Sequence, residues 1–459
     1  MAQRHGKMNG ITIRQRYTPA ILAFMVIVAL VLAGFFPVLL IGAKAGLAVG
    51  DPYLFHVAGF TLWQAGLSTV LSLALAIPVA RALARRRFPG RGIIIRLLAL
   101  PLALPAIVTV LGIVEVYGNQ GWLGGLFDIY GLPGILLAHV FFNFSLGARL
   151  LLSRLAAVPP ESWRLAAQLG FRDRHVWARI EWPHIWAVLP GIAILIFLLC
   201  TASFAVVLTL GGGPQATTLE VAIYQALRFD FDPARAVGLA LVQLFICSVL
   251  VLLAHRFGGQ MRAWQSFRSL SSRYDGTSLL ARLADGLAIA MGLAVLIPPI
   301  AAVVLSGMAH VELGGDVAAA TATSLAIGVC SASLSVMLTW PLAQAAARRQ
   351  GWSRLSSLAV VAGLVMPPAV LATGWFLLLT RFSTFAVPAP VLVIAMSTLM
   401  ALPFVYNALA AAIAASARQN DRLCASLGIS GVARFLRIDL PSLRRPLGFS
   451  FLMAAIVSL

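Results

Sequence analysis

Two polar stretches in this largely apolar chain, residues 164–183 and 422–441, carry the same residue types at the same spacing. Each begins with Arg-Leu-x-Ala-x-Leu-Gly, continues for nine residues, and ends with Ile, an acidic residue, any residue and Pro. A repeat of this length is a primary signal of how a chain is organised. Its residue types suit a short amphipathic helix that ends at a glycine. Two copies with the same spacing favour the docking of a soluble partner, and the alternative is an interfacial helix that only steadies the loop.

No catalytic or metal-binding pattern accompanies the repeat. The sequence lacks a Gly-x-x-x-x-Gly-Lys-Ser/Thr loop, and Lys44 has neither the preceding loop nor the following hydroxyl, so the chain cannot hydrolyse ATP through a P-loop. The four cysteines have no metal or redox spacing. The glycines at 211–213 precede Pro214 without a nearby Lys or Ser, which indicates a turn and not a phosphate site.

The composition is typical of a membrane protein. The chain is 60% hydrophobic and 11% charged, whereas a soluble domain carries about 25% charged residues. Apolar runs of about 20 residues recur, which is the length that a helix needs to cross a hydrocarbon core of about 30 Å. Because backbone polar groups in lipid must be satisfied internally, these runs predict an all-α polytopic membrane protein.

Eleven spans are predicted. They lie near residues 19–43, 57–80, 93–117, 131–153, 186–210, 236–256, 283–308, 317–343, 355–380, 388–415 and from 446 onward. The basic arm before the first run resembles a signal peptide, but the run is too long for one, so it is interpreted as a retained span. Pro105 and the prolines at 367–368 predict kinks in matching spans.

The net charge of +19 comes almost entirely from arginine, and its distribution gives an orientation. Arginine-rich loops alternate with loops poor in basic residues, and the segments 115–132 and 309–316 contain none. Under the positive-inside rule the N-terminus and both motif loops lie in the cytoplasm. Charge confined to alternate loops also argues against a nucleic-acid partner.

The repeat extends beyond the motifs. Residues 78–86 match 341–349, and both motif loops are expected on one side of the membrane, so the chain is a parallel duplication about an axis along the membrane normal. The predicted parts are an N-terminal arm with the first span at 1–56, a first repeat domain at 57–256, a cytoplasmic linker with a span at 257–316, and a second repeat domain at 317–459.

The second repeat is shorter after its motif than the first. The first continues for about two spans, to near residue 256, whereas the second ends inside an apolar run at Leu459. By the repeat, two bundles of about six transmembrane helices each are expected, with the second truncated at its C-terminus. A natural eleven-span protein is the alternative.

The repeated stretch resembles the EAA loop of ABC importer permeases, and the resemblance extends over essentially the whole chain. Residues 57–256 and 317–459 accordingly resemble ABC transmembrane type-1 domains. Within that family the chain is similar to the thiamine permeases of Gram-negative bacteria, on the stretches 165–170, 181–183, 210–227 and 232–235. Ferric-iron permeases, which are also fused duplicates, are the near alternative.

By this resemblance the two loops are coupling helices that dock on two cytoplasmic ATPase subunits. The residues expected to carry this coupling are Arg164, Leu165, Ala167, Leu169, Gly170 and Pro183 in the first copy, and Arg422, Leu423, Ala425, Leu427, Gly428 and Pro441 in the second. The family usually has a glutamate where this chain has Arg164 and Arg422, which puts the salt bridge of that glutamate with the ATPase in doubt. The first copy also has Trp182 where leucine is usual.

Polar residues at membrane depth are the candidates for the translocation pathway. His139 and Asn143, at i and i+4 in one predicted span, could line the pathway or could bond to neighbouring helices. Ser203 and Thr209 lie in the span that the resemblance places along the path.

The resemblance implies the permease subunit of a binding-protein-dependent ABC importer in the bacterial inner membrane, which moves thiamine or its phosphates inward by alternating access. Its expected partners are two copies of a cytoplasmic ATPase, which bind the ATP, a periplasmic substrate-binding protein, and the lipid bilayer. The chain itself is expected to hold no cofactor and no metal. Ferric iron or another small solute is the alternative cargo, and an ion-coupled secondary transporter is the alternative class.

Overall fold

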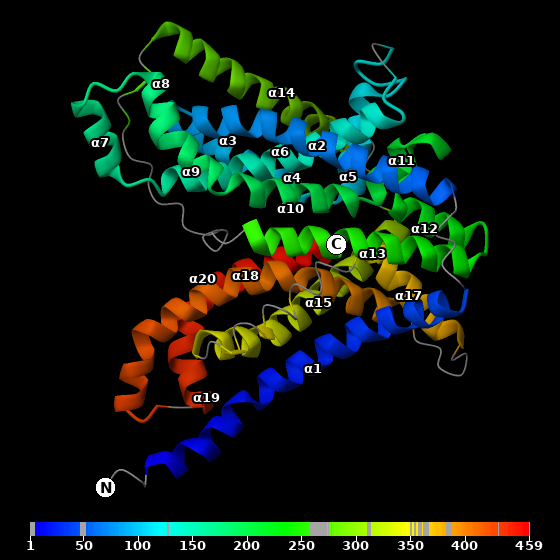
Figure 1. The fold of residues 1–459 in the computed structure, drawn as a ribbon, viewed down its shortest axis with the longest axis vertical. Helices are drawn as coiled ribbons and strands as arrows, with labels where there is room; N and C mark the ends of the chain where they lie inside the picture. The colour runs from blue at the N-terminus through cyan, green and yellow to red at the C-terminus, as the bar shows by residue number, and fades with distance from the viewer. Residues whose placement is uncertain are drawn as a thin grey trace. The chain divides into compact units, whose positions relative to one another are not determined.

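The computed structural model of the chain is built almost entirely of helices (Figure 1). It describes residues 5–45, 52–125, 128–257, 273, 275–276, 278–309, 314–348, 351–352, 355–356, 360, 367–381, 388–429 and 431–458. Among these residues there is no β-strand, and seven helices are long and apolar enough to cross a membrane, or up to nine if each of two bent pairs is one span. The prediction of an all-α polytopic membrane protein is confirmed.

Long helices occupy most of the predicted spans. They are α1 (His5–Ala45), α2 (Pro52–Arg85), α6 (Leu132–Ala156), α13 (Pro233–Phe257), α14 (Leu279–Ala309), α15 (Gly315–Arg348), α18 (Ala389–Ser426) and α20 (Leu440–Ser458). Most continue past the apolar run into polar residues, because helix propensity does not end where hydrophobicity ends. The predicted span 355–380 is described only in part, as α17 (Pro368–Arg381).

Two predicted spans are broken. The span 93–117 consists of α3 (Arg91–Leu97), α4 (Leu100–Ala103) and α5 (Ala106–Tyr117), with a bend of 111°. The break has a local cause, since Leu104 is extended, with ψ of 134°, as the residue before a proline prefers. The kink predicted at Pro105 is therefore confirmed, as a break.

The span 186–210 is also divided, into α10 (Leu189–Thr201) and α11 (Ala205–Leu210). The helical stretch before it, residues 173–186, meets α10 at 49°. The second kink was predicted at 367–368, where α17 begins, but residues 361–366 lie outside the described residues.

Packing groups the helices into two units that do not follow the chain order. One unit is Ala48–Glu312, and the other joins Met1–Leu47 to Leu313–Leu459. In the first, α2 lies against α6, α10 and α14. In the second, α15, α18 and α20 pack together, and α1 packs on α15 and α17. Helix α1, which precedes the first repeat in the sequence, thus packs in the unit of the second repeat. Helix α14, which precedes the second repeat, packs in the unit of the first.

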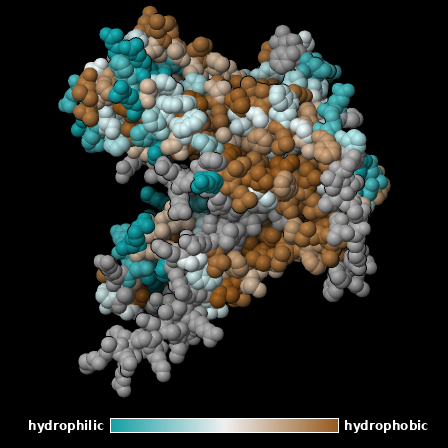
Figure 2. Space-filling model, viewed as in Figure 1, coloured by the Kyte–Doolittle hydropathy of each residue, from teal (hydrophilic) through white to brown (hydrophobic). Residues whose placement is uncertain are grey.

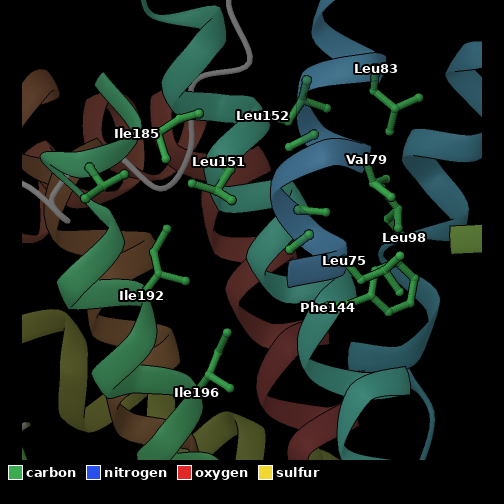
Figure 3. Packing of buried hydrophobic residues seen from close by; sticks show 14 of the residues in the cluster. Leu75, Val79, Leu83, Leu98, Phe144, Leu151, Leu152, Ile185, Ile192 and Ile196 are labelled. Carbon is green, nitrogen blue, oxygen red and sulfur yellow. The ribbon is translucent and has the colours of Figure 1, made fainter. Parts of the chain in front are cut away.

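The core of the first unit lies between α2, α6 and α10 (Figure 3). Leu75, Val79 and Leu83 recur every four residues on α2, so they form one apolar face of that helix. This face belongs to a buried cluster whose other members include Phe144 and Leu151 on α6. The cluster also contains Leu98, Leu152, Ile185, Ile192 and Ile196.

Hydrophobic side chains also cover much of the surface. Trp63 on α2 is 62% exposed, and Phe245 and Leu252 on α13 are 70% and 69% exposed. Figure 2 shows hydrophobic residues gathered over α13, and hydrophilic ones around α7 (Pro160–Gln168) and α8 (Asp173–Val176). Apolar surface of this extent suits contact with lipid, because soluble monomers rarely expose large apolar patches.

Helices α1 and α17 cross closely at two glycines. A Cβ atom on Gly374 would overlap the carbonyl oxygen of Gly34, and one on Gly34 would lie 2.8 Å from Leu371 and 2.9 Å from Trp375. Small residues at such crossings let membrane helices pack backbone to backbone.

Replacing Gly374 with Leu is expected to separate α1 from α17 and to lower the free energy of unfolding by about 1–3 kcal/mol, the usual cost of overpacking. The matched control is Gly448→Leu on α20, where a Cβ would meet nothing within 4 Å. Denaturant unfolding of the purified protein in detergent measures both. Equal stability of the two variants would contradict the close crossing.

Candidate functional site: the two repeated motif loops

The first motif loop begins with a short helix that is fixed at both ends. Pro159, with ψ of 140°, separates α7 from the preceding span α6. At the other end Gly170 takes φ of +65°, and the N–H of Phe171 donates to the carbonyl of Ala166 at 2.9 Å. This is the turn by which glycine terminates a helix, because it has no Cβ to oppose a left-handed conformation. The predicted role of Gly170 as a helix terminator is confirmed.

The second motif loop has the same turn but no separate short helix. Gly428 takes φ of +66°, and the N–H of Ile429 donates to the carbonyl of Cys424 at 2.9 Å. Here α18 runs without a break from the span to Ser426, so the predicted end of that span at 415 is wrong. The cause is local, since Ala417 and Arg418 stand where the first copy has its two prolines.

A π-helical segment follows in both copies at the same place. Segment η1 (Trp177–Glu181) comes after α8, and η3 (Phe435–Asp439) comes after α19 (Gly431–Arg434). Short π-helical turns are rare and occur frequently at functional sites. Their recurrence at matching positions shows that the duplication preserves the backbone path of the loop as well as its sequence.

Both loops present a matching pair of exposed leucines. Leu165 and Leu169 are 56% and 61% exposed, and their counterparts Leu423 and Leu427 are 55% and 62% exposed. The positions between them, Ala166 in the first copy and Cys424 in the second, are 5% and 1% exposed, so they form the buried side of the helix. Ala166 therefore does not share the exposed apolar face of the two leucines.

Most of the other predicted coupling residues are exposed as well. Arg164, Ala167, Gly170 and Pro183 are exposed in the first copy, as are Gly428 and Pro441 in the second. The side chains of Arg422 and Ala425 lie outside the described residues, although their backbone is part of α18.

A small core lies beneath the first loop. It consists of Val158, Trp163 and Val176, with Phe171 and Ile180 packed against it. Trp163 is 5% exposed, so the helix has one face packed on its own loop and one face open. An exposed apolar face on a packed support can dock a partner without unfolding.

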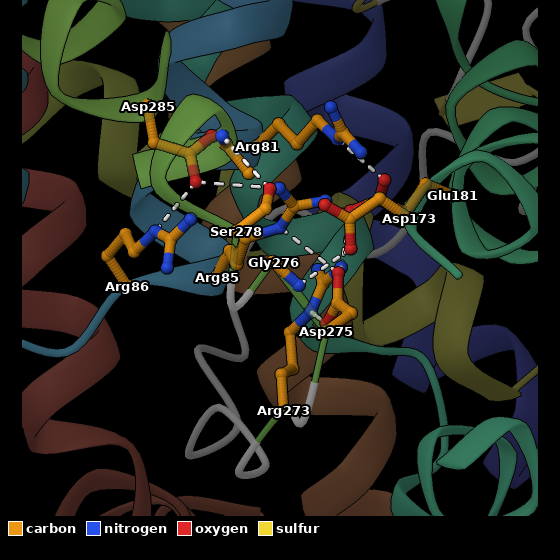
Figure 4. A network of polar contacts seen from close by, with 11 residues as sticks. Arg81, Arg85, Arg86, Asp173, Glu181, Arg273, Asp275, Gly276, Ser278 and Asp285 are labelled. Atoms are coloured by element: carbon orange, nitrogen blue, oxygen red, sulfur yellow. Dashed lines mark hydrogen bonds and ion pairs between the residues drawn. The ribbon is translucent and has the colours of Figure 1, made fainter. Parts of the chain in front are cut away.

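The acidic residue of the first motif is buried between two arginines (Figure 4). The Glu181 side chain is fully buried, and its two oxygens lie 2.7 Å from Nε of Arg81 and 2.6 Å from Nη2 of Arg273. Arg81 belongs to α2, whereas Arg273 comes from the connection before α14. A buried carboxylate requires such partners, because its dehydration is costly. We call this group, with Asp275, the Glu181 clamp.

The clamp continues from the connecting segment to α2. Asp275 accepts hydrogen bonds from Nε of Arg273 at 2.9 Å and from its Nη2 at 2.8 Å. Nε of Arg85 lies 3.0 Å from the Asp275 carboxylate, an ion pair without hydrogen-bond alignment. The N–H of Gly276 donates to Asp173 at 2.7 Å, which ties the same segment directly to the motif loop.

Aromatic rings and charge strengthen the clamp. The Arg273 guanidinium lies 4.0 Å from the ring centroid of Trp163, and that of Arg81 lies 4.7 Å from the centroid of Trp177. Burial alone would raise the pKa of Asp275, but the hydrogen bonds and charge of Arg273, with the charge of Arg85, outweigh it and lower that pKa below its ordinary value of 3.8. Burial alone would lower the pKa of Arg273, but its acidic partners Asp275 and Glu181 outweigh burial and raise that pKa above its ordinary value.

The second loop holds its acidic residue differently. Asp439 lies 3.4 Å from Nε of Arg434, which belongs to the same loop and also pairs with Asp421. Arg348, at the end of α15, lies 3.7 Å from Asp421. The position that matches Arg81 is Gln344, so α15 offers no cation there.

The pathway candidates on α6 lie between helices. His139 and Asn143 are 2% and 5% exposed. Nδ1 of His139 lies 3.1 Å from the Ser68 hydroxyl on α2, and the amide of Asn143 donates to Sγ of Cys200 on α10 at 3.3 Å. The structure thus brings these two together with α2 and α10.

The other two pathway candidates lie apart from that pair. Ser203 is half-buried in the break between α10 and α11. Thr209 on α11 is exposed, and its hydroxyl donates to the carbonyl of Ala205 in its own helix at 2.7 Å.

Comparison with known proteins identifies the family. The chain is 45% identical over 425 residues to a thiamine transport system permease protein of Brucella abortus (strain 2308), which covers 89% of this chain and 78% of the relative. A protein of the same name from Escherichia coli (strain K12) is 42% identical over 431 residues, covering 89% and 80%. The chain belongs to the family of thiamine transport system permease proteins. No protein-family model matches it.

A more distant relative matches part of this permease. The sulfate transport system permease protein CysW of Synechocystis (strain PCC 6803) is 28% identical over 215 residues, which cover 45% of this chain and 77% of the relative. Most of that permease therefore aligns with less than half of this chain.

Sequence patterns identified the loops of this permease but missed the Glu181 clamp. Arg81, Arg273 and Asp275 carry no motif, and all three lie far from Glu181 in the sequence. One signal was available in the sequence, since the same spacing places an acidic residue just before the next span in both copies. A buried acid in an apolar chain requires a cation nearby.

Replacing Glu181 with Ala is expected to lower the free energy of unfolding by about 3–5 kcal/mol, since it leaves the buried Arg273 and the partly buried Arg81 without this partner. The control Glu161→Ala, on the exposed first turn of α7, is expected to cost at most about 1 kcal/mol. Denaturant unfolding in detergent gives both values. Adding Arg273→Ala to Glu181→Ala should recover part of the loss; an additive double variant would refute the pairing.

The contribution of Asp275 depends on pH. Because its folded-state pKa lies below 3.8, its stabilisation is fully present above that pH and is lost as the pH falls through the lower, folded-state pKa. Asp275→Asn is therefore expected to cost about 1.5–3 kcal/mol at neutral pH and progressively less in acid, by denaturant unfolding across the pH range. Asp230→Asn, in a surface pair with Arg235, is the control and should cost about 0–1 kcal/mol. A pH-independent Asp275→Asn difference would contradict the clamp.

Proposed function

We propose that the chain is the permease subunit of a binding-protein-dependent ABC importer that carries thiamine, or its phosphates, inward. The observation that carries the proposal is 42–45% identity over 89% of the chain to proteins named for thiamine transport. The relatives do not favour ferric iron or another class of transporter. The chain is a transport component and performs no chemistry of its own.

The two motif loops are the docking sites for two copies of a cytoplasmic ATPase. Leu165 with Leu169, and Leu423 with Leu427, offer equally exposed apolar pairs. Apolar anchors seated in a partner's pocket supply most of the energy of such an interface. The ATPase copies bind the ATP, since this chain has no P-loop.

The anchoring of these loops supports a mechanism of alternating access. ATP can shift the transporter between inward-facing and outward-facing states only by binding one state better than the other. That difference reaches the spans if the loop moves as a rigid body, and the Glu181 clamp joins the first loop to α2. His139 and Asn143 lie where α6 meets α2 and α10, and with Ser203 and Thr209 they are the residues we assign to the pathway.

The arginine-rich loops support an orientation for the chain in the bacterial inner membrane. Under the positive-inside rule they favour a cytoplasmic N-terminus and cytoplasmic motif loops. The opposite, arginine-poor side is the docking side for a periplasmic substrate-binding protein.

Substituting Leu165 and Leu423 by Asp in one chain tests the docking. Each lost apolar anchor is expected to cost about 2 kcal/mol or more, a factor of about 30 in affinity, so the ATPase should no longer co-purify and uptake of labelled thiamine should cease. The control is Leu123→Asp, an exposed leucine outside the motifs, which should leave co-purification unchanged. Co-purification by the double variant would refute the docking surface. Unchanged thiamine uptake in a strain that lacks the intact transporter would refute the cargo.

A further inference from the structure

A cavity of about 800 Å³ opens beside the Glu181 clamp, at the ends of two spans. Its wall is formed by the last residue of α2 and the residues after it, by the connecting segment, and by the first turns of α14. The lining residues are Arg85, Arg86, Arg87, Phe88, Arg273, Asp275, Gly276, Arg282, Gly286 and Ile289. Neither the proposed docking nor the proposed pathway uses this space.

Positive charge exceeds negative charge around the cavity. Five of the lining residues are arginines and one is an acid, Asp275. Asp285 does not line the cavity, but its carboxylate lies 2.7 Å from Nε of Arg86 and 3.5 Å from Nη1 of Arg85. Against Asp275, Asp285 and Glu181, which pairs with Arg273, the five arginines leave an excess of two positive charges. Arg282 is exposed and makes no ion pair with any other residue that the structure describes.

Several guanidinium donors in this wall have no hydrogen-bond partner among the described residues. Nη2 of Arg85 and Nη2 of Arg86 are buried without a hydrogen bond to any described residue, and the Arg85 side chain is only 2% exposed. A buried donor without an acceptor costs free energy, so a site with two of them favours an acceptor that fills it.

The cavity lies where a phosphate group would meet both charge and apolar surface. Arg85 ends one candidate span and Leu279 begins another, so the cavity stands at the membrane boundary. Phe88 and Ile289 add apolar surface to the arginines. Planar guanidinium groups bind phosphate oxygens in pairs, and basic pockets between spans suit lipid head groups.

We propose that this cavity is a binding site for a phosphate group, held by Arg85, Arg86 and Arg282. The phosphate comes from the head group of an anionic phospholipid or from a soluble phosphate, and both sources share the same acceptor chemistry. This site goes beyond the proposed transport function. All of its lining residues belong to the unit Ala48–Glu312, so the site is complete without a bound ATPase and without the transported molecule.

The test uses the intact chain in nanodiscs, with Arg86→Gln/Arg282→Gln as the variant. The control is Arg96→Gln/Arg256→Gln, which removes the same charge from exposed residues outside the cavity. In one arm the nanodiscs contain phosphatidylglycerol in phosphatidylcholine, and native mass spectrometry measures the phosphatidylglycerol that stays bound. In the other they contain phosphatidylcholine alone, and calorimetry measures binding of inorganic phosphate and pyrophosphate.

The wild type and the control are expected to bind at least about tenfold more tightly than the variant, since each charged hydrogen bond lost is worth about that factor. Retention of phosphatidylglycerol with this pattern assigns a lipid head group, and binding of the soluble anions with this pattern assigns a free phosphate. Equal binding by all three proteins, or no binding of either probe, overturns the site. If the double variant does not fold, Arg282→Gln alone decides, because it breaks no described ion pair.

Discussion

The buried carboxylate of Glu181 is the constraint on which the first repeat depends. A charge with no exposure to solvent can stay ionised in a folded protein only if cations and donors replace its water. Arg81 reaches it from α2 and Arg273 reaches it from the segment before α14, so the loop, the span and the connecting segment must come together for Glu181 to have both partners. The loop is consequently anchored by charge at its end and by the small core around Trp163 at its start.

The second repeat meets the same constraint with different residues. Asp439 is also buried, but its cation is Arg434, which lies five residues before it in the same loop. Arg434 in turn pairs with Asp421, at the position that Trp163 occupies in the first copy. The duplication has therefore kept the features that set the backbone, the positive φ at the glycine and the π-helical segment, and has replaced the side chains that hold it in place.

Local features could be predicted from the sequence, and features that depend on distant contacts could not. Apolar runs predicted helices because lipid permits little else, and Gly170 predicted a helix end because only glycine takes that conformation freely. The pairing of Glu181 could not be predicted, since its partners lie 92 and 100 residues away. The assignment of α1 and α14 to the unit of the other repeat also depends on packing, as at the crossing of Gly34 and Gly374. Such packing gives no periodic pattern in the sequence from which it could be predicted. The continuity of α18 was predictable, since it needed only the absence of two prolines.

If the proposed partners move the two loops, the different anchoring of the loops determines which helices follow. The first loop is joined by Glu181 to α2 and, through Arg273, Asp275 and Arg85, to Asp285 on α14. Breaking a buried ion pair costs several kcal/mol. A displacement of this loop is therefore expected to move α2 and α14 with it, because that costs less free energy than breaking the ion pairs. In the second loop the ion pairs of Asp439 close within the loop, and the link to α15 is the longer, half-exposed contact of Arg348 with Asp421. Equal motion of two identical partners would therefore be transmitted unequally, with the tighter electrostatic link in the first repeat.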